Sequence, residues 1–184
     1  MTNLALDERG SRLRIHTYAE GLLARLAHDL ALEHAALRGT GTRTADGGTA
    51  EIEVPLSGFV VLGVLHGERL DETALSPSDR RDVLEKMRRE VFHASEGALL
   101  RARAELSGGA AKITVTPPAG RAVTVATRPT LSDEEGGGVR ARGAVDLSLA
   151  ALGSDPVKGP MGAFKVKDRI EVRFDLVFRA PQPA

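Results

Sequence analysis

The sequence contains no cysteine and no tryptophan, and aromatic residues make up only 3% of it. Without cysteine, the chain has no disulfides, no thiolate nucleophile and no cysteine-based zinc site. So few aromatics offer little for stacking nucleic-acid bases or for caging a cation. Lys+Arg and Asp+Glu balance at 25 each, so no net field attracts nucleic acid. We therefore expect no nucleic-acid partner.

Long hydrophobic runs are also missing. The longest apolar cluster, residues 59–65, is far shorter than the run of about 18 residues that indicates a transmembrane helix. The first residues, MTNLALDERGSRLR, lack a basic region followed by an apolar stretch, which is the pattern of a secretory signal. The sequence thus predicts no transmembrane segment and a cytoplasmic protein.

The length of 184 residues fits one domain, and no linker, repeat or low-complexity tract divides it. A chain of this size buries roughly 70% of the surface that its unfolded form exposes, so a substantial core is available. We expect a single domain over 1–184, with its core at about 11–180.

Alternation of apolar and polar residues dominates the chain. This period of two is typical of strands with one buried and one solvated face. The alternating runs cover 12–18, 49–57, 98–106, 111–116, 123–125, 139–149 and 169–178, with a less regular run at 30–40.

Turn-forming residues connect these runs and favour antiparallel hairpins. Examples are Asp46-Gly47-Gly48 and Ser107-Gly108-Gly109, whereas parallel strands would need long crossovers. About eight such strands can close into a barrel. The predicted fold class is therefore all-β, an antiparallel, lipocalin-like barrel of about eight strands.

One segment follows a helical pattern instead. Ser76 is a predicted N-cap, Pro77 occupies the first helical position, and Asp79 has near capping-box spacing. Val83, Leu84, Met87 and Val91 then form an apolar stripe at helical spacing. We predict a helix over about 77–92 that lies across the barrel, and a shorter helical piece near 22–28.

Many inward positions hold small residues. An eight-stranded barrel is either filled by its side chains or just wide enough for one small ligand, and small inward residues favour the second outcome. A packed core in which small and large residues alternate remains the alternative. The small inward residues are Ala50, Ala98, Ala102, Ala104, Ala111, Ala141 and Gly143.

Catalytic and metal-binding patterns are weak. His28 and Asp29 could act as a base and its orienter, but adjacent residues of an extended segment point in opposite directions. No G-x-S-x-G elbow supplies a nucleophile, and the five histidines show no ligand spacing. We expect no enzymatic activity, no metal and no cofactor, with a structural or ligand-orienting role for His28 and Asp29.

The order of these pieces resembles the YceI-like family of lipid-binding proteins. The stretch 15–22 followed by Ala27-His28-Asp29 is similar to the family's opening strand, short helix and His-containing return. Residues 50–54 resemble its third strand, and 75–91 resembles the helix that some members place between strands. Gly143 and the stretch 162–172 match the closing strand entry, so the likeness spans nearly the whole chain.

Three stretches depart from the family pattern. Residues 98–104 replace the usual P-x-I-x-F-x-S strand, and Ile113-Thr114-Val115 with the turn after it replaces a longer hairpin. Residues 152–156 stand where members often show Phe-Gly-Ile. These departures affect the identity of the ligand, because loops and inward residues determine what a barrel accepts.

The resemblance implies a tunnel for a polyisoprenoid or fatty-acyl chain, with the head group near one mouth. The leading hypothesis is a non-enzymatic carrier of such a hydrophobic ligand. The alternatives are a packed barrel that binds a protein partner and, third, an enzyme using His28 and Asp29; a homodimer stays open. The expected ligand-binding residues are Ile15, Leu26, His28, Leu32, Ile52, Val54, Leu100, Ala102, Ala104, Ile113, Ala141, Gly143, Val145, Val172 and Phe174.

Overall fold

The computed structural model describes residues 1–21, 28–159 and 164–180. The first half of its main sheet contains β1 (Thr2–Leu6), β2 (Arg12–Thr17), β4 (Asp29–His34), β5 (Arg38–Arg43), β6 (Gly47–Pro55), β7 (Phe59–His66) and β8 (Arg69–Asp71). The second half contains β9 (Leu99–Ser107), β10 (Ala110–Thr116), β11 (Val123–Thr127), β12 (Thr130–Glu134), β13 (Gly138–Ser148) and β15 (Arg169–Arg179). A separate pair consists of β3 (Ala19–Glu20) and β14 (Lys165–Val166).

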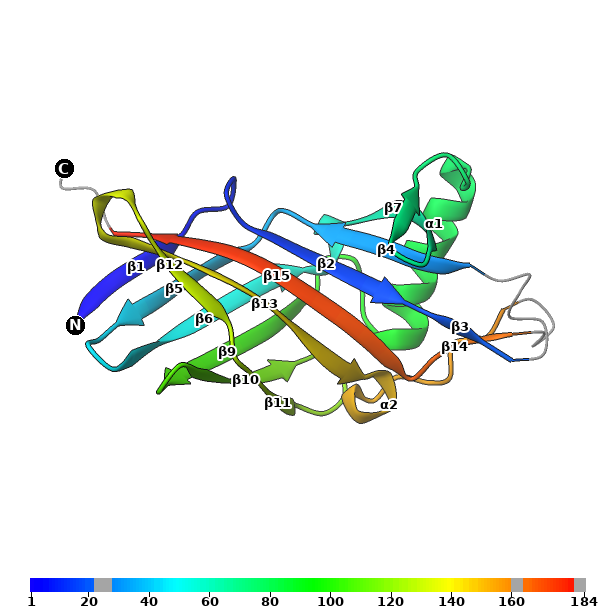
Figure 1. The fold of residues 1–184 in the computed structure, drawn as a ribbon. Helices are drawn as coiled ribbons and strands as arrows, with labels where there is room; N and C mark the ends of the chain where they lie inside the picture. Colours follow the sequence, from blue (N-terminus) through cyan, green and yellow to red (C-terminus); the bar gives the residue numbers. More distant parts are fainter. Residues whose placement is uncertain (22–27, 160–163, 181–184) are drawn as a thin grey trace.

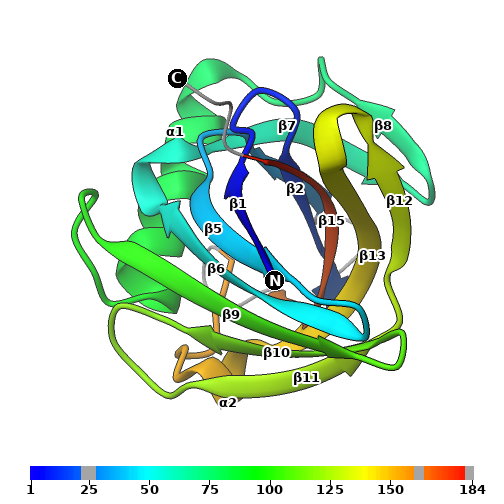
Figure 2. The same ribbon diagram turned by 90° about the vertical axis from the view of Figure 1, so that its left-hand side faces the viewer.

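Antiparallel pairing connects the main sheet into a barrel-like wall (Figures 1 and 2). From β1 and β2, pairing passes through β4 and β5, then β6 and β7, then β9, β10 and β11. β12 follows β11 in the chain and pairs with β13, which pairs with β15, and β15 returns to β1 and β2. The predicted all-β, antiparallel, barrel-like architecture is confirmed.

The expected count of about eight strands is not matched, because several long runs are interrupted. β1 and β2, β4 and β5, β6 and β7, and β11 and β12 each form one run that is broken by a few residues. The short strand β8 adds a further hairpin to β7. In addition, β1 precedes the expected start of the core near residue 11, yet its Leu4 and Leu6 are buried.

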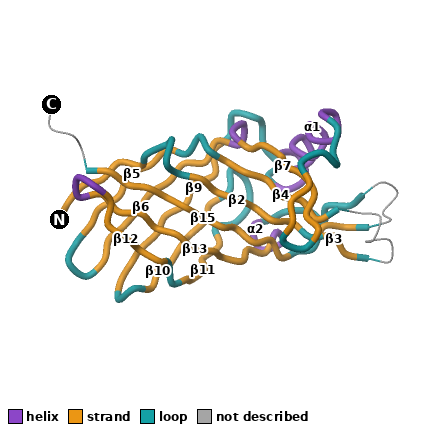
Figure 3. Tube along the Cα trace, turned by 45° about the horizontal axis from the view of Figure 1, so that its top comes forward, coloured by secondary structure: helices purple, strands orange, loops and turns teal. Residues whose placement is uncertain are grey.

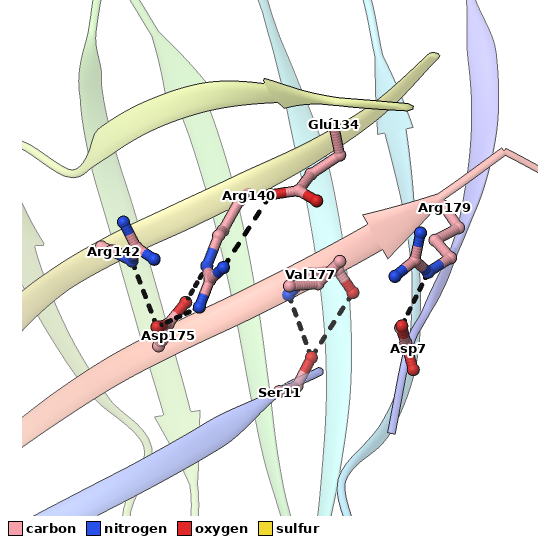
Figure 4. Close-up of polar contacts among 8 residues, drawn as sticks. All are labelled: Asp7, Ser11, Glu134, Arg140, Arg142, Asp175, Val177 and Arg179. Carbon is pink, nitrogen blue, oxygen red and sulfur yellow. Dashed lines mark hydrogen bonds and ion pairs between the residues drawn. The ribbon is translucent and has the colours of Figure 1, made fainter. Parts of the chain in front are cut away.

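A buried serine maintains the hydrogen bonding at the first interruption (Figure 4). Between β1 and β2 the chain leaves the edge of β15, and the Ser11 hydroxyl accepts from the Val177 N–H at 3.0 Å. The Asp7 N–H donates to the Val177 carbonyl at 2.8 Å. Since buried backbone groups need partners, these bonds allow β15 to remain continuous where its neighbour is not.

Two further interruptions lie side by side at the junctions of β4 with β5 and of β6 with β7. A single 3₁₀ turn, Leu56–Gly58, separates β6 from β7. The buried His34 ring bridges the two junctions through a 2.7 Å hydrogen bond between Nε2 and the Pro55 carbonyl. Leu37 and Leu56 fill the space around this crossing and are fully buried.

The predicted helix begins where the sequence placed it. α1 spans Pro77–Lys86, with Ser76 as N-cap and a capping box between Ser76 and Asp79. A π-helical turn, Met87–Val91, continues it, so the expected helix over about 77–92 is present but not α-helical throughout. The expected helical piece near 22–28 falls mainly on residues outside the described part of the chain.

Arg80 fastens α1 to the edge of β7. Its guanidinium donates to the carbonyls of Val61, Leu62 and Glu72, the Leu62 bond measuring 2.8 Å. The short helix α2 (Leu149–Leu152) follows β13 and lies at the same end of the barrel as α1 (Figures 1 and 3). Both helices are therefore placed at one end of the interior.

The outer wall carries paired charges (Figure 4). Arg140 forms a two-pronged ion pair with Asp175 at 2.6 and 2.7 Å, and Arg142 reaches the same carboxylate at 3.1 Å. The Arg140 side chain holds the pKa of Asp175 below its usual value. The charged members of the alternating runs thus face solvent, which leaves the interior to the apolar members.

Candidate binding cavity

The inward rows of the strands enclose a cavity of about 980 Å³. This volume lies at the upper end of the range of about 300–1,000 Å³ that is typical of small-molecule sites. Inward side chains from β1, β2, β4, β6, β9, β10, β13 and β15 contribute to its lining. The alternation in the sequence is therefore the direct cause of an apolar interior.

Small residues keep part of the wall thin. Ala50 and Ala104 lie opposite each other across β6 and β9, and Ala102 lies opposite Ile52. Across β9 and β10, Ala104 faces Ile113 and Ala102 faces Val115. Because the alanines do not reach into the centre, they leave room that larger side chains at the same positions would occupy.

Most of the residues expected to bind ligand line this cavity. They come from seven strands, which contribute to one interior surface although many of them are far apart in the sequence. The expected residues among the lining are Ile15, Leu32, Ile52, Val54, Leu100, Ala102, Ala104, Ile113, Ala141, Val145, Val172 and Phe174.

Gly143 faces inward but does not line the cavity. It pairs directly with Phe174, and a Cβ atom at residue 143 would lie 2.6 Å from the tip of that ring. The space left by the glycine is therefore filled by Phe174, which corrects the expectation that Gly143 adds to the cavity. The sequence contained both residues but did not show that they are cross-strand partners.

The pair His28 and Asp29 does not contribute to the cavity wall either. His28 is exposed, so the expectation that it contacts ligand is not supported by its position. The Asp29 carboxylate accepts a hydrogen bond from the Ala19 N–H at 2.8 Å, which ties β4 to β3. This contact gives Asp29 a structural role. Leu26, also expected in the site, lies outside the described residues.

The helical end of the cavity is lined by residues that were not expected to bind ligand. Val83 and Met87 come from α1 and the π-helical turn after it, and Leu149 and Leu152 come from α2. The apolar stripe of the helix was recognisable in the sequence, but its neighbours across the cavity were not. Among the lining residues at this end, Val91, Phe92, Leu149 and Leu152 are buried.

At the opposite end the lining becomes polar and exposed; we call this end the mouth. It consists of residues 41–49 around the β5–β6 turn, 106–109 around the β9–β10 turn, Pro129 and residues 131–133. Arg43, Asp46 and Asp133 are exposed there, as is Leu131. The cavity therefore meets solvent at the mouth.

Two histidines are buried in the wall without lining the cavity. His34 packs edge-on against Phe59, with ring centroids 4.8 Å apart, and its Nδ1 has no hydrogen-bond partner. Burial lowers the pKa of His34, partly offset by its bond to Pro55. His16 lies on the outer face of β2, where burial and the charge of Arg173 lower its pKa.

Within residues 1–21, 28–159 and 164–180, no group of three or more potential metal ligands comes together. None of the helices in these ranges is long and apolar enough to cross a bilayer. The described residues form an apolar cavity with a polar mouth, an arrangement that can enclose an apolar molecule.

Comparison with known proteins supports the fold. The structure is similar to BcnA from Burkholderia cenocepacia, with a TM-score of 0.63 and 13% identity over 94% of this chain and 98% of that one. This likeness supports a YceI-like fold. An alginate lyase from Klebsiella pneumoniae aligns with 10% identity over 100% of this chain and 59% of that one. Its TM-score of 0.20 is too low to indicate a shared fold. No family model matches the sequence, and no curated protein does.

Proposed function

We propose that this protein is a non-enzymatic carrier that holds a long apolar chain, of the polyisoprenoid or fatty-acyl kind, inside its barrel. The observation that carries the proposal is the apolar cavity of about 980 Å³ with a polar mouth. The likeness in fold to BcnA is consistent with it. A packed barrel, the alternative drawn from the sequence, would have filled this space with side chains.

The expected affinity follows from the apolar contact. Burying a methylene group contributes roughly 0.8 kcal/mol, so ten enclosed methylenes give about 8 kcal/mol before any cost. Ordering the chain and restricting its motion oppose a large share of this gain. We therefore expect dissociation constants of about micromolar order.

The same cavity defines the experiment. Ala102→Phe combined with Ala141→Phe adds two aromatic rings to the cavity wall, one from β9 and one from β13. The double variant should remain folded, because open space can absorb volume that a packed core cannot. It should lose binding of an apolar fluorescent dye, measured by titration alongside circular dichroism.

The matched control places the same two rings on the outside. Ala126 and Ala144 are exposed alanines of the same barrel, and Ala126→Phe with Ala144→Phe should leave dye binding unchanged. If the inward variant unfolds, the single variants decide whether the interior was already full. An inward variant that folds and binds normally would contradict the proposal, because the ligand would then lie elsewhere. Native mass spectrometry of the purified protein should reveal a co-purified lipid.

A further inference from the structure

Charge is distributed unevenly along the cavity. Among the described residues that line it, three are charged, namely Arg43, Asp46 and Asp133, and all three lie at the mouth. Arg43 ends β5, Asp46 lies in the following turn, and Asp133 belongs to β12. Their formal charges sum to one negative charge. We call these three residues the charged ring. The polar end of any bound amphiphile would lie at the charged ring, since the helical end is apolar.

The one cation of this ring already has a partner. Arg43 Nη1 lies 2.8 Å from Asp133 Oδ1, and the two side chains are 44% and 79% exposed. The bond joins strands that do not pair with each other, because β5 pairs with β1 and β6 whereas β12 pairs with β13. Viewed along the barrel, the tip of the β5–β6 hairpin extends toward the side of β12 and β13 (Figure 2).

The positive charge of Arg43 is therefore balanced by Asp133. Asp46 adds a second negative charge, and it forms no ion pair within residues 1–21, 28–159 and 164–180. A carboxylate or phosphate arriving at the mouth would compete with Asp133 for the guanidinium and would be repelled by both aspartates. An uncharged or cationic group would not compete with Asp133 for the guanidinium and would not be repelled by the two aspartates. The mouth also contains the hydroxyl groups of Thr44, Ser107 and Ser132, which can form hydrogen bonds with an uncharged polar group.

We propose that Arg43, Asp133 and Asp46 form a charge filter at the mouth, which selects amphiphiles with an uncharged or cationic polar end against those with an anionic end. This inference rests on the proposed function, because it assigns specificity to the same cavity. Selection arises from the ring, while the apolar interior supplies most of the binding energy and is indifferent to the head group.

The test uses three ligands that share one alkyl chain: dodecanol, dodecanoate and dodecylammonium. The affinity of each ligand is measured by its displacement of the apolar dye at low ionic strength and about pH 8, where dodecanoate is negatively charged and dodecylammonium is positively charged. Interactions between exposed charges contribute up to about 1 kcal/mol, which corresponds to about fivefold in affinity. Wild-type protein should bind dodecanoate up to about fivefold more weakly than dodecanol.

Two variants at the mouth should change this ratio in opposite directions. Asp133→Asn removes one negative charge and frees Arg43, so dodecanoate should gain up to about fivefold relative to dodecanol. Arg43→Gln leaves two negative charges, so dodecanoate should weaken further and dodecylammonium should strengthen. The control is Asp146→Asn, because Asp146 forms an equally short 2.8 Å pair with Arg169 on the outer wall. It should leave all ratios unchanged.

The outcomes separate the filter from the carrier. If wild-type protein binds neither the dye nor dodecanol, the proposed carrier function is wrong. If it binds them but treats the three ligands alike, or if Asp133→Asn and Asp146→Asn behave identically, the filter is wrong. Raising salt to about 1 M shortens the screening length to about 3 Å and should remove the discrimination. Discrimination that persists at that salt concentration would also overturn the filter.

Discussion

The two ends of the barrel differ in both chemistry and construction. The helical end is lined by buried apolar side chains such as Phe92 and Leu152, whereas the mouth is lined by turns, hydroxyls and three charged residues. An amphiphile can satisfy both environments in only one orientation, with its apolar tail among the helices and its polar group at the mouth. The difference therefore teaches how a ligand would be oriented before its identity is known.

The ends also differ in what stabilises them. At the helical end, the Asp155 N–H and the Ser154 hydroxyl both donate to the Glu90 carbonyl, joining the π-helical turn to the segment after α2. At the mouth, the exposed ion pair of Arg43 and Asp133 joins β5 to β12. We expect stability to reside at the helical end and ligand exchange to occur at the mouth.

The largest expected effect compares one leucine from each end. Leu152 and Leu131 both line the cavity, but Leu152 is 2% exposed and Leu131 is 43% exposed. Leu152→Ala should lower the free energy of unfolding by about 2–5 kcal/mol, because buried contacts are lost and a void remains. Leu131→Ala should change it by less than about 0.5 kcal/mol. Urea denaturation of the two variants measures both, and equal losses would contradict the contrast.

The next effect concerns the attachment of α1. Arg80→Ala removes the donor shared by the carbonyls of Val61, Leu62 and Glu72, and leaving such groups unpaired costs about 1–3 kcal/mol. Amides of α1 should also exchange faster with solvent deuterium, since the helix loses its anchor to β7. The exposed neighbour Arg81 provides the control, and Arg81→Ala should alter neither quantity. Unchanged α1 exchange in Arg80→Ala would show that other contacts hold the helix.

The features of the fold that depend on local sequence pattern could be predicted from the sequence. Alternation assigned inward and outward faces correctly along β6, β9, β10, β13 and β15, because successive side chains of a strand point to opposite faces. The start of α1 was predictable because Ser76, Pro77 and Asp79 act within one helical turn. These signals were sufficient to identify an apolar interior and most of its lining.

The remaining features depend on which strands become neighbours. The strand interruptions follow from contacts such as Ser11 with Val177, which alternation does not reveal. The loss of space at Gly143 requires knowing that Phe174 lies opposite. The pairing of Arg43 with Asp133 joins distant segments through the closure of the barrel, and neither residue carries a local signal. Site chemistry at the mouth was therefore not predictable from either segment alone.

The smallest effect tests the junction that lies between the two ends, where His34 bridges the broken strands. Burial lowers the pKa of His34 in the folded protein below the value of 6.5 that is usual for histidine. Its Nε2 is bonded to the Pro55 carbonyl, so an added proton would go to Nδ1, which has no partner.

The direction of the pH dependence follows from this difference. As pH falls below about 6.5, the unfolded chain takes up a proton before the folded protein does, so the free energy of unfolding decreases until the folded-state pKa is reached. One histidine contributes at most about 1.4 kcal/mol per pH unit in that window. His16, whose pKa is also lowered, acts in the same direction. His34→Gln should therefore reduce the slope without abolishing it. Urea denaturation between about pH 7 and pH 5 measures the slopes. An unaltered slope in His34→Gln would mean that the region around His34 opens to solvent more readily than the burial of this side chain indicates.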